Sequence, residues 1–181
     1  MYDVDERAIA RLVAPWIRGN PCLIALLVVL LACATSPDTR RADLVAYLHQ
    51  LRDWAPQDAE AAATVRRLLD SQFADESEVR HQIADSRPEV AAQLERAREY
   101  QPRTTELEAI HRRYRDAWAT LLRAYDEIGH GLDRGDQAAL SAGRRDLLAW
   151  RRAITAVAAD VGELADRYDA RSEAGPPAPS R

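Results

Sequence analysis

The feature that most constrains the fold is a stripe of large apolar side chains that recurs every three or four residues between residues 107 and 132. Because an α-helix has 3.6 residues per turn, this spacing places the whole stripe on one helix face. We therefore expect an amphipathic helix of about 30 residues with that face in a core. The stripe consists of Leu107, Ile110, Tyr114, Trp118, Leu121, Tyr125, Ile128 and Leu132.

A second apolar stripe with the same spacing runs from Leu140 to Tyr168. Gly135 suits the end of the first helix, because glycine readily adopts left-handed backbone angles. Asp136 suits the N-cap of the second, because its carboxylate accepts hydrogen bonds from free helical N–H groups. So short a connection predicts an antiparallel hairpin. If its turn is centred between Arg134 and Gly135, the pairs expected at one level are Trp118 with Trp150 and Leu121 with Leu147 or Leu148.

Prolines divide the preceding part of the chain. Ser36-Pro37 fits an N-cap followed by the first helical residue, and the apolar pattern predicts a helix from there to about Asp53. Pro56 is expected to open a second helix, whose pattern weakens around residues 75–77. Pro88 is expected to open a third, shorter helix, because proline is favoured in the first turn of a helix and disfavoured inside one.

Gln101-Pro102 is expected to end the third helix, and Thr105 with Glu108 has the spacing of a capping box that would start the long helix. The sequence shows neither strand-like alternation nor an internal repeat. The predicted fold is all-α: an elongated antiparallel up-and-down helical bundle with a long C-terminal helical hairpin. Residues 33–170 are expected to form this single domain, and residues 171–181 a disordered tail.

An unbroken apolar run, CLIALLVVLLAC, extends from Cys22 to Cys33. It is shorter than the about 20 residues that a membrane-spanning helix needs, and it has the length of the apolar segment of a secretory signal peptide. Arg18 precedes the run and Ser36-Pro37-Asp38 follows it, as polar mature sequence follows a cleavage zone. Residues 1–32 are therefore predicted to be a signal peptide.

The run ends in Leu30-Leu31-Ala32-Cys33, which resembles the lipobox of bacterial lipoproteins, because Ala32 precedes the cysteine and Leu30 supplies the apolar upstream position. Leu31 departs from the smaller residue usual in that pattern. The resemblance implies that Cys33 is acylated and that membrane lipid holds the protein on the cell envelope, at a periplasm-facing membrane or at the cell surface. An uncleaved signal anchor, an ordinary cleaved signal and a buried core helix are the alternatives.

The first 20 residues are less positive than the start of a signal peptide should be, because three acidic residues offset three arginines. Two interpretations fit this composition. Translation could begin nearer Val13, which would remove the acidic part, or residues 4–17 could form a short amphipathic helix on the cytoplasmic face.

Three of the four histidines follow a glutamate at i−3, which places a carboxylate and an imidazole on one helix face. This arrangement resembles the Glu-x-x-His element of ferritin-like di-metal bundles, and it makes Glu78, His81, Glu108 and His111 candidate metal ligands. The third pair lies about 28 Å along the same helix from the second, so only one of them could join Glu78 and His81. Solvated pairs on helix faces are the simpler interpretation, and no metal or cofactor is predicted. The three pairs are Glu78/His81, Glu108/His111 and Glu127/His130.

The net charge is −4, and no basic patch with interleaved aromatic residues occurs, so nucleic acid is not an expected partner. The sequence contains no nucleophile elbow, CxxC motif or glycine-rich phosphate loop. We therefore predict a membrane-tethered, non-enzymatic envelope lipoprotein whose helical module binds an envelope protein or has a structural role. The alternative is a bundle that binds a metal through the Glu-x-x-His pairs or a small ligand against the aromatic stripe, although aromatic residues at helical spacing more often fill a core.

Overall fold

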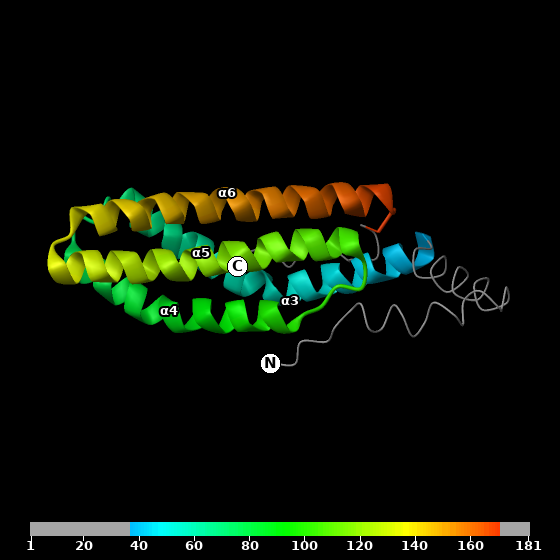
Figure 1. Cartoon of the computed structure of the whole chain (residues 1–181), viewed down its shortest axis with the longest axis horizontal. Helices are drawn as coiled ribbons and strands as arrows, with labels where there is room; N and C mark the ends of the chain where they lie inside the picture. Colours follow the sequence, from blue (N-terminus) through cyan, green and yellow to red (C-terminus); the bar gives the residue numbers. More distant parts are fainter. Residues whose placement is uncertain (1–36, 171–181) are drawn as a thin grey trace, which may run out of the picture. The chain divides into compact units, whose positions relative to one another are not determined.

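The computed structural model describes residues 37–170, and the chain within this range is almost entirely helical (Figure 1). The all-α prediction is confirmed, and these residues contain no β-strand. No helix in this range is both long enough and apolar enough to cross a membrane. The predicted signal peptide, Cys33 and the C-terminal tail lie outside the described residues. The helices are α3 (Pro37–Asp70), α4 (Glu76–Glu99), α5 (Thr105–Arg134) and α6 (Gln137–Arg167).

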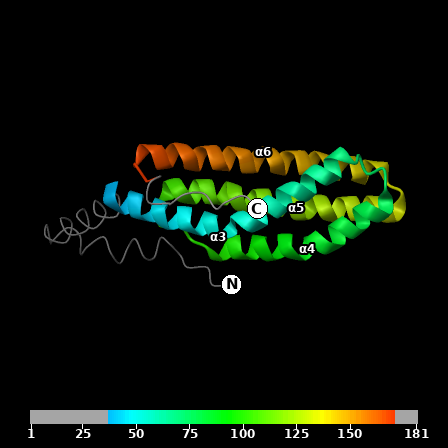
Figure 2. The ribbon, with the colours of Figure 1, turned by 180° about the vertical axis from the view of Figure 1, so that it is seen from behind.

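Consecutive helices run in opposite directions, so the predicted up-and-down antiparallel bundle is confirmed (Figures 1 and 2). From Arg41 onward the helices belong to one compact unit. Within it α5 lies between α4 and α6, and the backbones of α5 and α6 approach one another most closely. Side chains from all four helices join one continuous apolar core.

The α5–α6 hairpin has the predicted turn and register. Gly135 adopts left-handed backbone angles with φ of 64°, and the Asp136 side chain accepts hydrogen bonds from the first backbone N–H groups of α6. The indole rings of Trp118 and Trp150 lie opposite one another with their centroids 6.0 Å apart. Gly143 allows the close approach, because a Cβ atom there would lie 2.5 Å from a side-chain carbon of Ile128.

The structure corrects two predicted helix boundaries, since α3 continues through Pro56 and α4 continues through Pro88. Both prolines are solvent-exposed, so water can reach the carbonyl groups that lose their helical partners. The apolar face of α3 also continues across the proline, with Trp54 and Ala61 buried on either side of it. Figure 2 shows α3 changing direction partway along its length, as a proline kink would cause.

The chain reverses instead at residues 71–75, close to the place where the predicted pattern weakens. Gln72 and Phe73 adopt positive φ angles of 50° and 61°, which are uncommon for residues other than glycine. Asp75 then caps α4, because its side chain accepts a hydrogen bond from the backbone N–H of Glu78 at 3.1 Å.

The predicted capping box of Thr105 and Glu108 is also wrong. Thr104 occupies the N-cap position of α5, and its hydroxyl donates to Asp43 at 2.8 Å rather than capping its own helix. The Asp43 carboxylate also accepts from the backbone N–H groups of Thr104 and Arg103, at 2.8 and 3.0 Å. A buried carboxylate of α3, only 6% exposed, therefore satisfies the N–H groups of the α4–α5 connection.

Candidate functional site

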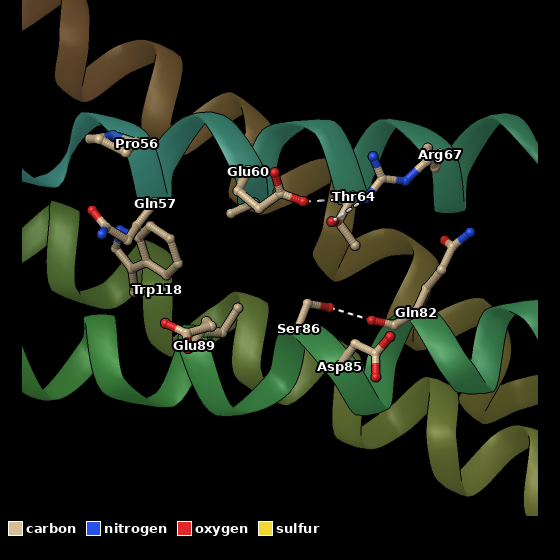
Figure 3. Close-up of a pocket in the computed structure, with 12 residues that line it drawn as sticks. Pro56, Gln57, Glu60, Thr64, Arg67, Gln82, Asp85, Ser86, Glu89 and Trp118 are labelled. Carbon is tan, nitrogen blue, oxygen red and sulfur yellow. Dashed lines mark hydrogen bonds and ion pairs between the residues drawn. The ribbon is translucent and has the colours of Figure 1, made fainter.

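A groove with a cavity volume of about 440 Å³ lies between α3 and α4. Trp118 of α5, only 1% exposed, forms part of its floor. Small side chains face one another across the gap, namely Ala61 and Thr64 of α3 and Ser86 of α4. Figure 3 shows Gln57, Glu60 and Thr64 on one side, Asp85, Ser86 and Glu89 on the other, and Trp118 between the helices.

The groove is open because neither helix supplies a large apolar side chain at this level. Toward the α3–α4 turn, the core is filled by Val65, Leu68, Val79 and Ile83. Away from the turn, it is filled by the aromatic rings around Trp54. Between these two packed layers, Ala61, Thr64 and Ser86 leave a space that leucine-sized residues would occupy in a close-packed bundle.

The rim of the groove is predominantly acidic. Glu60, Asp85 and Glu89 contribute three carboxylates, and Arg67 is the only basic residue among the lining side chains described. Arg67 donates to the Thr64 hydroxyl at 2.8 Å and lies 3.6 Å from a Glu60 oxygen. Asp85 lies 3.3 Å from the His81 ring, whereas Glu89 has no hydrogen-bond or ion-pair partner in the described part of the chain.

Two buried polar atoms of the lining residues have incomplete hydrogen bonding. The Gln57 side-chain oxygen, Oε1, is buried and accepts from no described donor. The Trp118 indole N–H lies close enough to the Tyr114 hydroxyl to lower the pKa of that group, but it forms no hydrogen bond of normal geometry. Buried polar atoms are usually paired, so these two atoms are exceptions among the residues that line the groove.

Beside the groove, a chain of hydrogen bonds connects α3, α5 and α4. The Tyr114 hydroxyl donates to Asp58 at 2.8 Å and accepts from the buried Gln93 amide at 2.8 Å. Gln93 in turn accepts from Arg96 at 2.9 Å. Burial raises the pKa of Asp58 to about 6, although the hydrogen bond from Tyr114 opposes this change. Burial and the nearby Asp58 carboxylate both raise the pKa of Tyr114.

His111 lies deeper, within a cluster of aromatic rings. Its Nε2 donates to the Ala97 carbonyl at 2.7 Å, so Nδ1 is the acceptor for the Tyr47 hydroxyl at 3.3 Å. Burial lowers the pKa of His111, so the neutral ring is favoured. The ring stacks near Trp54 and Tyr114, with centroid distances of 6.1 Å to each. Both ring nitrogens are therefore engaged within the core.

The four candidate metal ligands do not converge. Glu78, His81 and Glu108 are exposed, whereas His111 is 2% exposed and faces the core. The described residues contain no group of three or more histidine, cysteine, aspartate or glutamate side chains that could hold a metal. The interpretation of Glu108/His111 as a solvated pair is wrong for His111, which belongs to the aromatic core, whereas Glu108 is exposed.

The aromatic stripe mainly fills the core, as expected from its spacing. Tyr114, Trp118, Tyr125 and Trp150 are all 2% exposed or less, and only Trp118 lines the groove. The other lining residues could not be predicted from the sequence, because they belong to two helices whose pairing is not encoded in a strong periodicity. The available signal was the combination of small side chains and nearby prolines on α3 and α4.

No known protein family, curated protein or solved structure matches the chain. The geometry of the groove is therefore the main basis for proposing a function.

Proposed function

We propose that this protein is a membrane-tethered, non-enzymatic envelope lipoprotein whose helical bundle is a binding module, with the α3–α4 groove as its binding site. The groove is the observation that supports the binding role. Its volume of about 440 Å³ lies within the range of small-molecule pockets, which is about 300 to 1,000 Å³. Apolar residues at its base combined with polar residues around them are also found in such pockets.

The chemistry of the groove favours binding over catalysis. Its two hydroxyl groups have other partners, because Ser86 donates to the Gln82 carbonyl and Thr64 accepts from Arg67. Neither hydroxyl contacts a group that could act as its general base within the described residues. Of the two ligand types in the alternative function, the groove favours a small ligand, whereas the dispersed Glu-x-x-His pairs give no support to a metal.

The tether is proposed from the sequence around Cys33. Several acyl chains on one cysteine would hold a bundle durably on a bilayer, because each buried CH₂ group contributes about 0.8 kcal/mol. The binding module would then act at the envelope, on a component that reaches the membrane surface.

Metabolic labelling with a fatty acid tests the tether in the full chain. A Cys33→Ser variant should lose the label and the membrane association, whereas Cys22→Ser should be labelled like the parent. An unmodified Cys33 within an intact peptide of the mature protein, found by mass spectrometry, would contradict the proposal.

A further inference from the structure

We infer that the α3–α4 groove binds a small organic cation with an apolar body about the size of one aromatic ring. The inference rests on the proposed role of the groove as a binding site, and it adds the chemical class of the ligand. It is supported by the charge of the rim, by the hydrogen-bonding groups and by the floor.

The charge of the rim favours a cation. Three carboxylates, of Glu60, Asp85 and Glu89, line the groove together with one guanidinium group, of Arg67, which leaves an excess of two negative charges. Arg67 lies near Glu60 and so offsets the charge on the α3 side. Asp85 and Glu89 of α4 are exposed and lie four residues apart, on the same helix face. A cation between the helices would reduce the repulsion between these two carboxylates.

The hydrogen-bonding groups favour a donor-rich ligand. The Glu89 carboxylate is exposed at the groove and has no partner among the described residues, so it is an acceptor that a ligand can reach. One guanidinium nitrogen of Arg67, Nη2, donates to Thr64 and lies near Glu60. An ammonium group carries three donors and no acceptor, so it complements this arrangement.

The floor favours an organic cation over a metal ion. Trp118, Val90 and Ala61 are buried apolar residues, and Pro56 adds apolar surface at one end of the groove. An apolar body in the groove would be removed from water against these side chains. The carboxylates do not form a cluster that could hold a metal ion among the described residues.

Four related probes test the ligand class on the full chain purified in detergent, with binding followed by calorimetry at neutral pH. Phenethylamine has both the charge and the ring, phenylethanol lacks the charge, phenylpropanoate reverses it, and diaminobutane lacks the ring. We expect saturable binding of phenethylamine, with each of the other three weaker by about tenfold or more, which corresponds to about 1.4 kcal/mol. Equal binding of phenylethanol or diaminobutane would overturn the inference.

Variants locate the binding. Asp85→Asn combined with Glu89→Gln should weaken phenethylamine binding by about tenfold or more. Glu95→Gln combined with Glu99→Gln is the matched control, because it removes the same charge from exposed positions of the same helix outside the groove. Unchanged binding in the first pair would contradict the inference.

A groove-filling variant distinguishes failure of the inference from failure of the proposed function. Ala61→Leu should abolish binding, because Ala61 lines the cavity and is 5% exposed. If phenethylamine and phenylethanol bind equally and Ala61→Leu removes both, the groove is a binding site but the ligand class is wrong. If no probe binds saturably, or if Ala61→Leu leaves binding unchanged, both the inference and the role of the groove in the proposed function fail.

Discussion

Burial raises the pKa of the Asp58 carboxyl from an ordinary 3.8 to about 6, so the folded chain holds this proton more tightly than the unfolded chain does. Between these two pH values, the folded state binds more protons at Asp58. The contribution of Asp58 to the free energy of unfolding therefore falls as the pH rises from about 4 to about 6, and it stays reduced at higher pH.

An Asp58→Asn variant should remove this dependence. Its amide oxygen can still accept the hydrogen bond from Tyr114, while the cost of a half-buried charge is gone. We expect the variant to be more stable than the parent by about 1 to 3 kcal/mol at pH 7 and to lose this advantage below about pH 4. Urea unfolding at both pH values measures the difference, and Asp53→Asn, an exposed change on the same helix, is the control. A variant no more stable than the parent at pH 7 would contradict the argument.

Replacing His111 should be costly, because both of its ring nitrogens are bonded within the core. His111→Ala would leave the Ala97 carbonyl and the Tyr47 hydroxyl unpaired beside a cavity, and it should lower the free energy of unfolding by about 2 to 4 kcal/mol. His81→Ala is the matched control, since His81 is exposed, and it should change stability by about 0.5 kcal/mol or less. Similar losses in both variants would show that burial of His111 contributes little.

The pH dependence of His111 has the opposite sign to that of Asp58. Because burial lowers the pKa of His111 below 6.5, the unfolded chain binds its proton more readily. The stability that the neutral ring contributes is present above pH 6.5 and is lost as the pH falls toward the lowered value. The burial of His111 could not be predicted from the sequence, because the glutamate three residues before it suggested a solvated helix face. The partners that bury the ring come from α3 and α4.

At the scale of elements, two glycines with contrasting surroundings test the packing of α5 against α6. A Cβ atom at Gly143 would lie 2.5 Å from Ile128 and 3.0 Å from the Ala124 carbonyl oxygen, whereas one at Gly129 would meet nothing within 4 Å. Gly143→Ala should therefore push the helices apart and destabilise the fold by about 1 to 3 kcal/mol. Gly129→Ala should stabilise α5 by about 0.5 to 1 kcal/mol, because alanine has the higher helix propensity. Thermal unfolding measures both, and changes of the same sign would contradict the close approach.

The helix boundaries that could be predicted from the sequence are those with a local chemical cause. Gly135 and Asp136 end α5 and cap α6 as expected, because these groups act within a few residues. The boundaries predicted at Pro56 and Pro88 were wrong. The free-energy cost of a proline inside a helix is offset there by burial of an apolar helix face that continues on both sides of the proline. The cap at Thr104 was missed because its partner, Asp43, is about 60 residues away in the chain.

At the scale of the molecule, the Trp118–Trp150 contact lies in the middle of the closely packed hairpin, and both rings are almost completely buried. Trp118→Ala or Trp150→Ala should lower the free energy of unfolding by about 3 to 5 kcal/mol, because each leaves a large cavity. Chemical denaturation followed by circular dichroism measures the loss. Near-neutral effects in both variants would contradict the register of the hairpin.

The hairpin was predictable because one periodic stripe specifies both its faces and its register. The pairing of α3 with α4 could not be predicted in the same way. The residues that face one another at the groove are small and polar, so they show no apolar periodicity in the sequence. The candidate site therefore coincides with the part of the core that the sequence pattern describes least well.

The backbone of α3 does not approach any other helix as closely as α5 approaches its two neighbours, and the rings of Tyr47 and Trp54 span the distance to α5. A helix attached through side chains can detach while the other helix pairs stay intact, so amide hydrogens of α3 should exchange with solvent faster than those of α5. Because α3 supplies one wall of the groove, a ligand would bind only the attached form. Occupancy of the groove would then slow amide hydrogen exchange in α3 selectively. A bound molecule would therefore be detected as less frequent local opening of a single helix.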